Sequence, residues 1–310
     1  MTRVERPLLK PWYRLSVDGG RSTLRYAGSV LEFEGVAAER LLPSLLPLLD
    51  GTRTVDDVVG ELGEAVRPAV EHALSLLRAH DLLTEAVPRG AAAGARRTAE
   101  LLAAVDPAGR TCAELHAAVA SAEARVLGTG PAAETLGRLL QASGVAGVGA
   151  LGWDDPIPRG GLAIAAPAPG ELELLEAWNT RALEADAAWL PVLPFDGRLA
   201  AVGPVVVPGQ TACHECYRIR RDSTISPVAD HARGAYPGAP ALDLVLAGVA
   251  ALVALRWLAG STADAGVLVA VELAPELRCT RHFVYRVPRC PACSPSARRA
   301  AASPWSPVAA

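Results

Sequence analysis

The sequence predicts an α/β protein built from a winged-helix domain followed by a Rossmann-like domain. Three observations predict this fold class: three short strands precede three helices in the first 86 residues, a strand–glycine turn–helix–strand unit begins near residue 124, and two Cys-x-x-Cys pairs lie near the end. A length of 310 residues is also typical of two domains.

Three antiparallel strands are predicted at the front of the chain. Residues 12–17 form a largely apolar run that ends at Asp18-Gly19-Gly20, a turn sequence typical of hairpins. Residues 22–26 alternate between polar and apolar side chains, and residues 29–33 follow a second glycine.

Three helices are predicted next. The first covers residues 36–49 with one apolar face, the second begins at a Thr54/Asp57 capping pair, and the third covers residues 66–80. The third helix lacks the basic face that a DNA-reading helix needs, so nucleic-acid binding is not expected. Residues 82–84 add a short strand.

The remainder of the chain follows an α/β pattern. Residues 87–123 are predicted to be an Ala-rich linker with helices, and residues 124–296 a second domain in which Gly128 and Gly130 form a tight turn before a helix. Further strands are predicted over 145–151, 162–166, 189–195, 199–207 and 277–287, with helices over 171–185 and 241–258. Residues 297–310 are expected to be a flexible tail.

The two cysteine pairs predict a structural zinc site. Cys213, Cys216, Cys290 and Cys293 supply four thiolates, which satisfy a tetrahedral Zn²⁺ and leave no position for a substrate. Two disulfides or unpaired core cysteines are the alternative, but nothing marks the chain as secreted.

Charge and hydropathy restrict the function classes. The formal net charge of −3 implies no broad surface for polyanions. The start of the chain has no apolar run typical of a signal peptide, and the apolar stretch 241–258 contains Asp243 and Arg256, so it is predicted to be a buried helix. A cytoplasmic protein that does not enter a membrane is expected.

The front of the chain resembles the PqqD-like fold, which recognises the leader peptides of ribosomally made, post-translationally modified peptides. The resemblance covers residues 11–85, and its most telling part is residues 46–59. It implies that a leader peptide adds as a strand to an edge and lies against the third helix. Carried over, the binding residues are Val30, Leu31, Glu32, Phe33, Val70, Leu74 and Leu77. Each of these apolar residues is also compatible with a role in the core alone.

Residues 125–291 resemble the ThiF-like fold of ubiquitin-type activating enzymes. The Gly128/Gly130 turn, residues 179–189, residues 202–216 and the second cysteine pair carry the resemblance. Active members adenylate a carboxylate with ATP and need basic residues on the triphosphate. This sequence has no lysine after Lys10, so the glycine turn is expected to be vestigial and ATP is not expected to bind. Arg138, Arg159 and Arg181 are the candidate substitutes for a lysine, although a guanidinium is not equivalent to an amine.

Together the two modules resemble the ThiF-like partner proteins of YcaO cyclodehydratases, found in thiopeptide and related azole-forming pathways. The resemblance implies a non-catalytic subunit that binds a precursor leader and docks onto the YcaO enzyme, which forms azolines with ATP. A homodimer is compatible with this interpretation. The alternatives are an ATP-dependent adenylating enzyme that acts on a peptide, or a nicotinamide oxidoreductase with structural zinc.

Overall fold

The computed structural model describes residues 6–18, 21–26, 29–158, 160–223 and 238–294 and divides the chain into two compact units, Met1–Ala117 and Ala118–Ala310. The expected tail, residues 297–310, lies outside the described residues.

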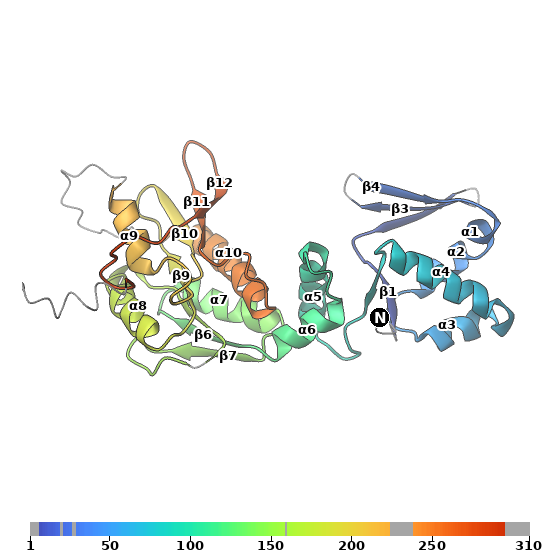
Figure 1. Ribbon diagram of the computed structural model, residues 1–310, viewed down its shortest axis with the longest axis horizontal. Helices are drawn as coiled ribbons and strands as arrows, with labels where there is room; N and C mark the ends of the chain where they lie inside the picture. The colour runs from blue at the N-terminus through green and yellow to red at the C-terminus, as the bar shows by residue number, and fades with distance from the viewer. Residues whose placement is uncertain (1–5, 19–20, 27–28, 159, 224–237, 295–310) are drawn as a thin grey trace, which may run out of the picture. The chain divides into compact units, whose positions relative to one another are not determined.

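The N-terminal unit contains an antiparallel three-stranded sheet, in the order β2 (Arg14–Asp18), β3 (Arg21–Tyr26) and β4 (Ser29–Phe33) (Figure 1). β4 is therefore an edge strand of this sheet. A second sheet of two strands pairs β1 (Pro7–Leu9) with β5 (Leu83–Glu85). The three strands predicted from the sequence are observed, whereas β1 was not predicted.

The helices that follow differ from the prediction at two points. The expected single helix over 36–49 is divided into α1 (Val36–Arg40), α2 (Leu42–Leu45) and the 3₁₀ turn η1 (Leu46–Leu48), because Pro43 and Pro47 each remove a backbone donor. Val36 is exposed and does not belong to the apolar face, which is a second correction.

The later helices of this unit agree with the predicted pattern. Thr54 and Asp57 form the predicted capping box at the start of α3 (Val55–Leu62). A 3₁₀ turn η2 (Glu64–Val66) leads into α4 (Arg67–Ala79), and α5 (Ala93–Val105) and α6 (Cys112–Ala120) complete the segment. Three strands precede the helices as expected, while the assignment of a winged helix remains a prediction.

The C-terminal unit is built on a mixed seven-stranded sheet in the order β12-β11-β10-β9-β8-β6-β7. β6 (Glu123–Leu127), β7 (Gly147–Leu151), β8 (Leu162–Ala165) and β9 (Trp189–Leu193) pair in parallel. β10 (Leu199–Val202), β11 (Val267–Glu272) and β12 (Arg278–Phe283) continue the sheet in antiparallel pairs. β11 was not predicted, and the strand expected over 277–287 is shorter.

Helices pack onto this sheet from segments between the strands. They are α7 (Pro131–Ala142), α8 (Leu174–Glu184), which the 3₁₀ turn η3 (Pro169–Glu171) precedes, α9 (His214–Ser223) and α10 (Pro240–Leu258). α10 is long and apolar enough to cross a membrane by composition, yet one of its sides is buried in this unit, as in a core helix. The helix predicted to be buried is buried on one side, and its other side exposes Leu244 and Leu252.

Candidate functional site

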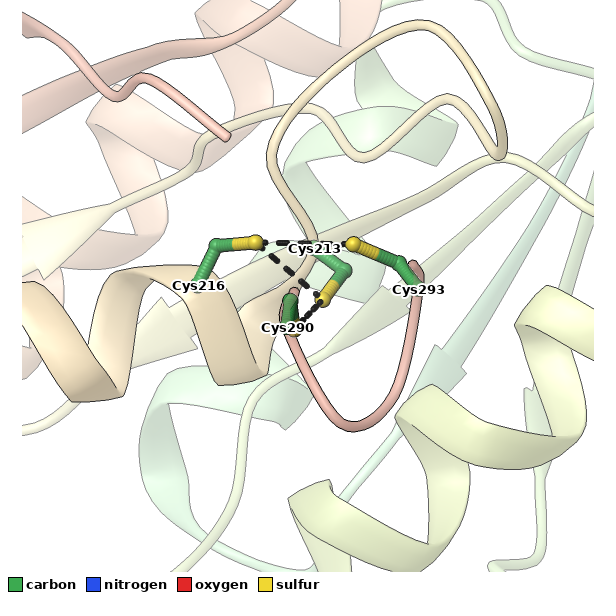
Figure 2. Close-up of side chains that lie close together, drawn as sticks. All are labelled: Cys213, Cys216, Cys290 and Cys293. Carbon is green, nitrogen blue, oxygen red and sulfur yellow. Dashed lines mark hydrogen bonds between the residues drawn. The ribbon is translucent and has the colours of Figure 1, made fainter. Parts of the chain in front are cut away.

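Four cysteine sulfurs lie together in the C-terminal unit (Figure 2). The Sγ–Sγ distance is 3.8 Å for Cys213–Cys216 and for Cys213–Cys290 and 3.5 Å for Cys216–Cys293, and all four sulfurs lie within 4.8 Å of one another. A tetrahedral ion with metal–sulfur bonds of about 2.3 Å places its sulfurs about 3.8 Å apart. A disulfide would need about 2.05 Å. The four predicted cysteines therefore form a site that fits a tetrahedral ion such as zinc.

Two short segments that are distant in the sequence build this site. Cys213 precedes α9 and Cys216 lies in its first turn, whereas Cys290 and Cys293 lie on the loop after β12. The side chains of Cys213, Cys216 and Cys290 are buried. With all four coordination positions taken by sulfur, an ion bound here would join the start of α9 to the loop after β12 and would contact no substrate.

Residues around the cysteines hold both segments in place. The backbone N–H of Val287 donates to Cys216 Sγ (3.3 Å), and the Arg286 guanidinium donates to the carbonyls of Gly209 (2.7 Å) and Cys293 (3.3 Å). On the side of α8, the buried Asn179 Oδ1 accepts from the backbone N–H of His214 (3.0 Å). Arg286 could not be identified from the sequence, because its role depends on a contact with a loop 77 residues away.

The electrostatics of the cluster favour a cation. The hydrogen bond from the Cys213 thiol lowers the pKa of Cys216 to about 4, and the hydrogen bond to Cys216 together with burial raises the pKa of Cys213. Thiols so close together cannot all ionise without a positive charge between them, so metal binding and proton release are coupled here. The remaining cysteines, Cys112 and Cys279, lie outside the cluster, the first buried and the second exposed.

The glycine turn predicted before α7 is present. Gly128 has φ of +114°, and a Cβ atom there would collide with the carbonyl of Ala166, so only glycine fits. Gly130 is the N-cap residue of α7 with an ordinary φ of −88°. The turn lies where β6 ends, at the carboxyl edge of the parallel strands, which is the usual ligand edge of such sheets.

A carboxylate of the chain itself occupies this turn. Glu171 Oε2 accepts from the backbone N–H of Thr129 (3.2 Å) and of Ala168 (2.8 Å), and its Oε1 accepts from the Thr129 hydroxyl (3.0 Å). Burial acts to raise the pKa of Glu171, but these hydrogen bonds outweigh it and hold the pKa below the ordinary value of 4.5. The ionised carboxylate thus takes donors that a phosphate would need, a role that the sequence analysis missed.

The crevice beside the turn offers little to a nucleotide. It measures about 110 Å³, against about 300 Å³ or more for typical ligand pockets. Asp243 is the one charged side chain among the described residues that line it, and burial raises the pKa of this carboxyl. Arg181 donates to the carbonyls of Trp153, Asp154 and Asp155, so its guanidinium is already bound.

Of the other two candidate arginines, only Arg138 is among the described residues. Arg138 is exposed on α7 and does not line the crevice, and Arg159 lies outside the described residues.

The N-terminal unit contains a groove between the end of β4 and α4. Its hollow of about 220 Å³ is mainly apolar, and the following residues line it: Phe33, Glu34, Ala38, Leu41, Leu42, Ala69, His72, Ala73, Leu76 and Leu77. β4 pairs only with β3 among the described residues, so its other edge is free, and Phe33 at the end of β4 lines this groove.

The predicted peptide-contact residues divide into two groups. Val30 and Glu32 are exposed on β4, and Leu31 and Phe33 pack partly against the core. On α4, Leu77 forms part of the groove, but Val70 and Leu74 are buried in the core and do not line it. Peptide contact by these residues stays a prediction, and among the residues predicted on α4 only Leu77 lines the groove. His72 and Leu76 line it in place of Val70 and Leu74.

Comparison with known proteins supports the fold. No family model matches the chain, and no curated protein matches it. Among solved structures, the heterocyclase TruD is similar with a TM-score of 0.71 and 20% identity over 96% of this chain and 43% of that chain. A heterocyclase in complex with substrate and cofactor has a TM-score of 0.69 and 20% identity over 94% of this chain and 40% of that chain. The chain thus spans about two fifths of these heterocyclases.

A third similar structure matches over nearly its whole length. MccB of E. coli, solved with ATP, has a TM-score of 0.58 and 13% identity over 93% of this chain and 99% of that chain. At these identities the matches establish the fold, and they support the ThiF-like fold that the sequence predicts.

Proposed function

We propose that the chain is a non-catalytic subunit that binds the leader of a ribosomally made precursor peptide and delivers it to a YcaO cyclodehydratase. The free edge of β4 beside an apolar groove is the observation that carries this proposal. The similarity to a heterocyclase solved with its substrate, and to the peptide-modifying enzymes TruD and MccB, supports a role in peptide modification.

The groove suits an extended peptide better than a compact ligand. A strand added to β4 gains backbone hydrogen bonds along its length, and every second side chain points toward α4. One apolar side chain at the end of β4 then enters the hollow between Phe33 and Leu76. This arrangement is the PqqD-like mode of recognition, in which the backbone supplies affinity and the pocket supplies specificity.

The absence of adenylation in this chain is supported by the occupied glycine turn. An incoming phosphate must displace Glu171 from the Thr129 and Ala168 N–H groups and then lie near the carboxylate of Asp243. In the proposed role the second unit is a scaffold with a structural zinc ion, and ATP is used by the YcaO enzyme. Tethering the leader raises the local concentration of the core peptide at that enzyme.

The rival function is an ATP-dependent adenylating enzyme that acts on a peptide. Its support is the match to MccB with ATP over nearly both chains. The two functions predict opposite results when the purified protein is mixed with a candidate precursor peptide.

Binding and exchange measurements decide between them. The proposal expects the labelled leader to bind in fluorescence anisotropy, with no ATP–pyrophosphate exchange by this protein alone and azoline formation once the neighbouring YcaO protein is added. Exchange without the YcaO protein would establish the rival, and absence of leader binding would refute the delivery role.

A further inference from the structure

The three-stranded sheet of the N-terminal unit has an outer face that points away from the core. Leu24 and Leu31 point inward and pack in the core cluster that includes residues of α4 (Figure 1). Because successive side chains of a strand alternate between faces, the residues between them in sequence point outward. The outer face consists of Arg14, Ser16, Asp18, Arg21, Thr23, Arg25, Val30 and Glu32, all of them exposed except Thr23.

One row across this outer face carries two like charges. Arg14 lies directly opposite Arg25 in the β2–β3 pair, and Arg25 lies directly opposite Val30 in the β3–β4 pair. Like charges directly opposite each other destabilise a sheet. In the described part of the chain, neither guanidinium has an ion pair or a hydrogen bond that offsets this repulsion. An acidic group brought to this row is therefore favoured electrostatically.

The row ends at the free edge of β4. Val30, its last member, is 53% exposed and carries no charge of its own. A leader strand paired with β4 would place one side chain beside Val30 on the outer face, two strand spacings or about 9.5 Å from Arg25. The long side chains of an arginine and a glutamate can meet across this separation. The same contact would cover the apolar surface of Val30.

The neighbouring row selects against an acid. Ser16, Thr23 and Glu32 lie opposite one another in it, so the row ends at the free edge with a carboxylate. Glu32 forms no ion pair with Arg25 among the described residues. An acidic leader side chain is thus favoured beside Val30 and disfavoured beside Glu32.

The inward-facing positions fix where an apolar leader side chain lies relative to the acid. Phe33 lines the hollow of the groove, and it follows Val30 by three residues on the opposite face of β4. A leader strand in register with β4 keeps this separation. Its acidic residue and the apolar residue that enters the hollow are therefore three positions apart.

We propose that Arg25 determines leader specificity by pairing with an acidic side chain of the leader, three residues from the apolar side chain that enters the hollow. Arg14 adds to the positive potential of the row. The occupant of the outer face is an acidic leader segment, because the row of like charges ends at the edge where the leader pairs. This inference rests on the proposed function, since it requires the leader on β4.

The first experiment compares R25E with wild type by anisotropy, using the fluorescein-labelled leader of the candidate precursor peptide and the full-length protein. Exposed ion pairs are weak individually, and charge reversal adds repulsion, so we expect Kd to rise about threefold to tenfold. The difference should shrink as ionic strength rises from about 0.1 M to about 1 M. The matched control is R97E, at an exposed arginine of α5, which should change Kd by less than about twofold.

The outcomes separate this inference from the function on which it rests. A wild-type protein that binds the leader, with R25E binding equally well at low salt, would refute the role of Arg25 and leave peptide delivery standing. A wild-type protein that binds no leader would refute the proposed function and this inference together. Circular dichroism should show R25E to be folded, because Arg25 is exposed.

The second experiment locates the acid by charge exchange. Each Asp and Glu of the leader is changed to Lys in turn and titrated against wild type, R25E and R97E. One Lys leader should bind wild type more weakly and recover affinity with R25E but not with R97E, which is the signature of a direct pair. The leader residue whose truncation is non-additive with L76A should lie three positions away, since Leu76 lines the hollow. No exchangeable position, or one at an even separation from the residue coupled to Leu76, would overturn the proposal.

Discussion

Leu74 and Leu76 lie on the same helix, two residues apart, and are predicted to have opposite effects. Leu74 is 1% exposed in the core of the N-terminal unit, whereas Leu76 is 47% exposed and lines the groove. Truncation of a buried leucine costs about 2–5 kcal/mol of unfolding free energy. L74A should therefore lower the urea midpoint strongly and leave leader affinity per folded molecule unchanged.

The expected effect of L76A follows from the area that a bound peptide would cover. Full burial of a leucine side chain contributes about 1.5–3 kcal/mol, so covering the exposed half of Leu76 contributes about 1 kcal/mol, or roughly fivefold in Kd. Unfolding should change by less than about 0.5 kcal/mol. Anisotropy titration and urea unfolding measure both quantities, with L101A on α5 as an exposed-leucine control outside the groove. Equal loss of stability in L74A and L76A, or unchanged leader affinity of L76A, would refute the assignment of the groove as the leader-binding site.

Three further predictions concern the C-terminal unit. C213S should abolish stoichiometric zinc in elemental analysis and lower the yield of soluble protein, whereas C279S should keep the metal; zinc retained by C213S would exclude the four-cysteine site. E171Q removes a group whose pKa is held low in the folded state, so its contribution is present above the unfolded pKa of about 4.5 and is lost as pH falls through the folded value. E171Q should therefore flatten the acid side of the stability curve and still support no pyrophosphate exchange; an unchanged acid slope would contradict this. G128A should lower the free energy of unfolding by more than about 2 kcal/mol in thermal unfolding, because position 128 has a positive φ and the added methyl group would collide with the Ala166 carbonyl. A variant as stable as the wild type would contradict the geometry of the turn.

Features that depend on local chemistry could be predicted from the sequence. The Thr54/Asp57 cap depends on residues three apart. Each cysteine pair is itself a local motif. Because a tetrahedral ion needs four ligands, the two pairs are expected to meet although 77 residues separate them. The three strands of the first sheet follow from alternation and turn residues for the same reason.

Features that depend on tertiary packing could not be predicted in the same way. The periodicity of α4 correctly identifies its apolar stripe, but a stripe says only which side is buried, and the core takes Val70 and Leu74 while the flank of the helix faces the groove. Glu171 lies 42 residues after Thr129, and no local pattern connects a carboxylate in a 3₁₀ turn to a glycine turn. β11 was missed although its sequence, Val-Leu-Val-Ala-Val-Glu after Gly266, carries the local signal of a strand.

The distribution of free hydrogen-bonding groups separates the parts of this fold that bind from the parts that support. A site that binds a ligand must keep donors or acceptors available for it, since buried groups without partners are costly. At the glycine turn, Glu171 already holds the N–H groups of Thr129 and Ala168, and Arg181, one of the candidate arginines, is bound to carbonyls. The edges of β4 and β12 remain unpaired among the described residues, and both lie beside exposed or grooved apolar surface. Among the described residues, the outer edge of β4 thus keeps its backbone groups available next to an apolar groove, which the proposed peptide binding requires, whereas Glu171 holds N–H groups of the glycine turn.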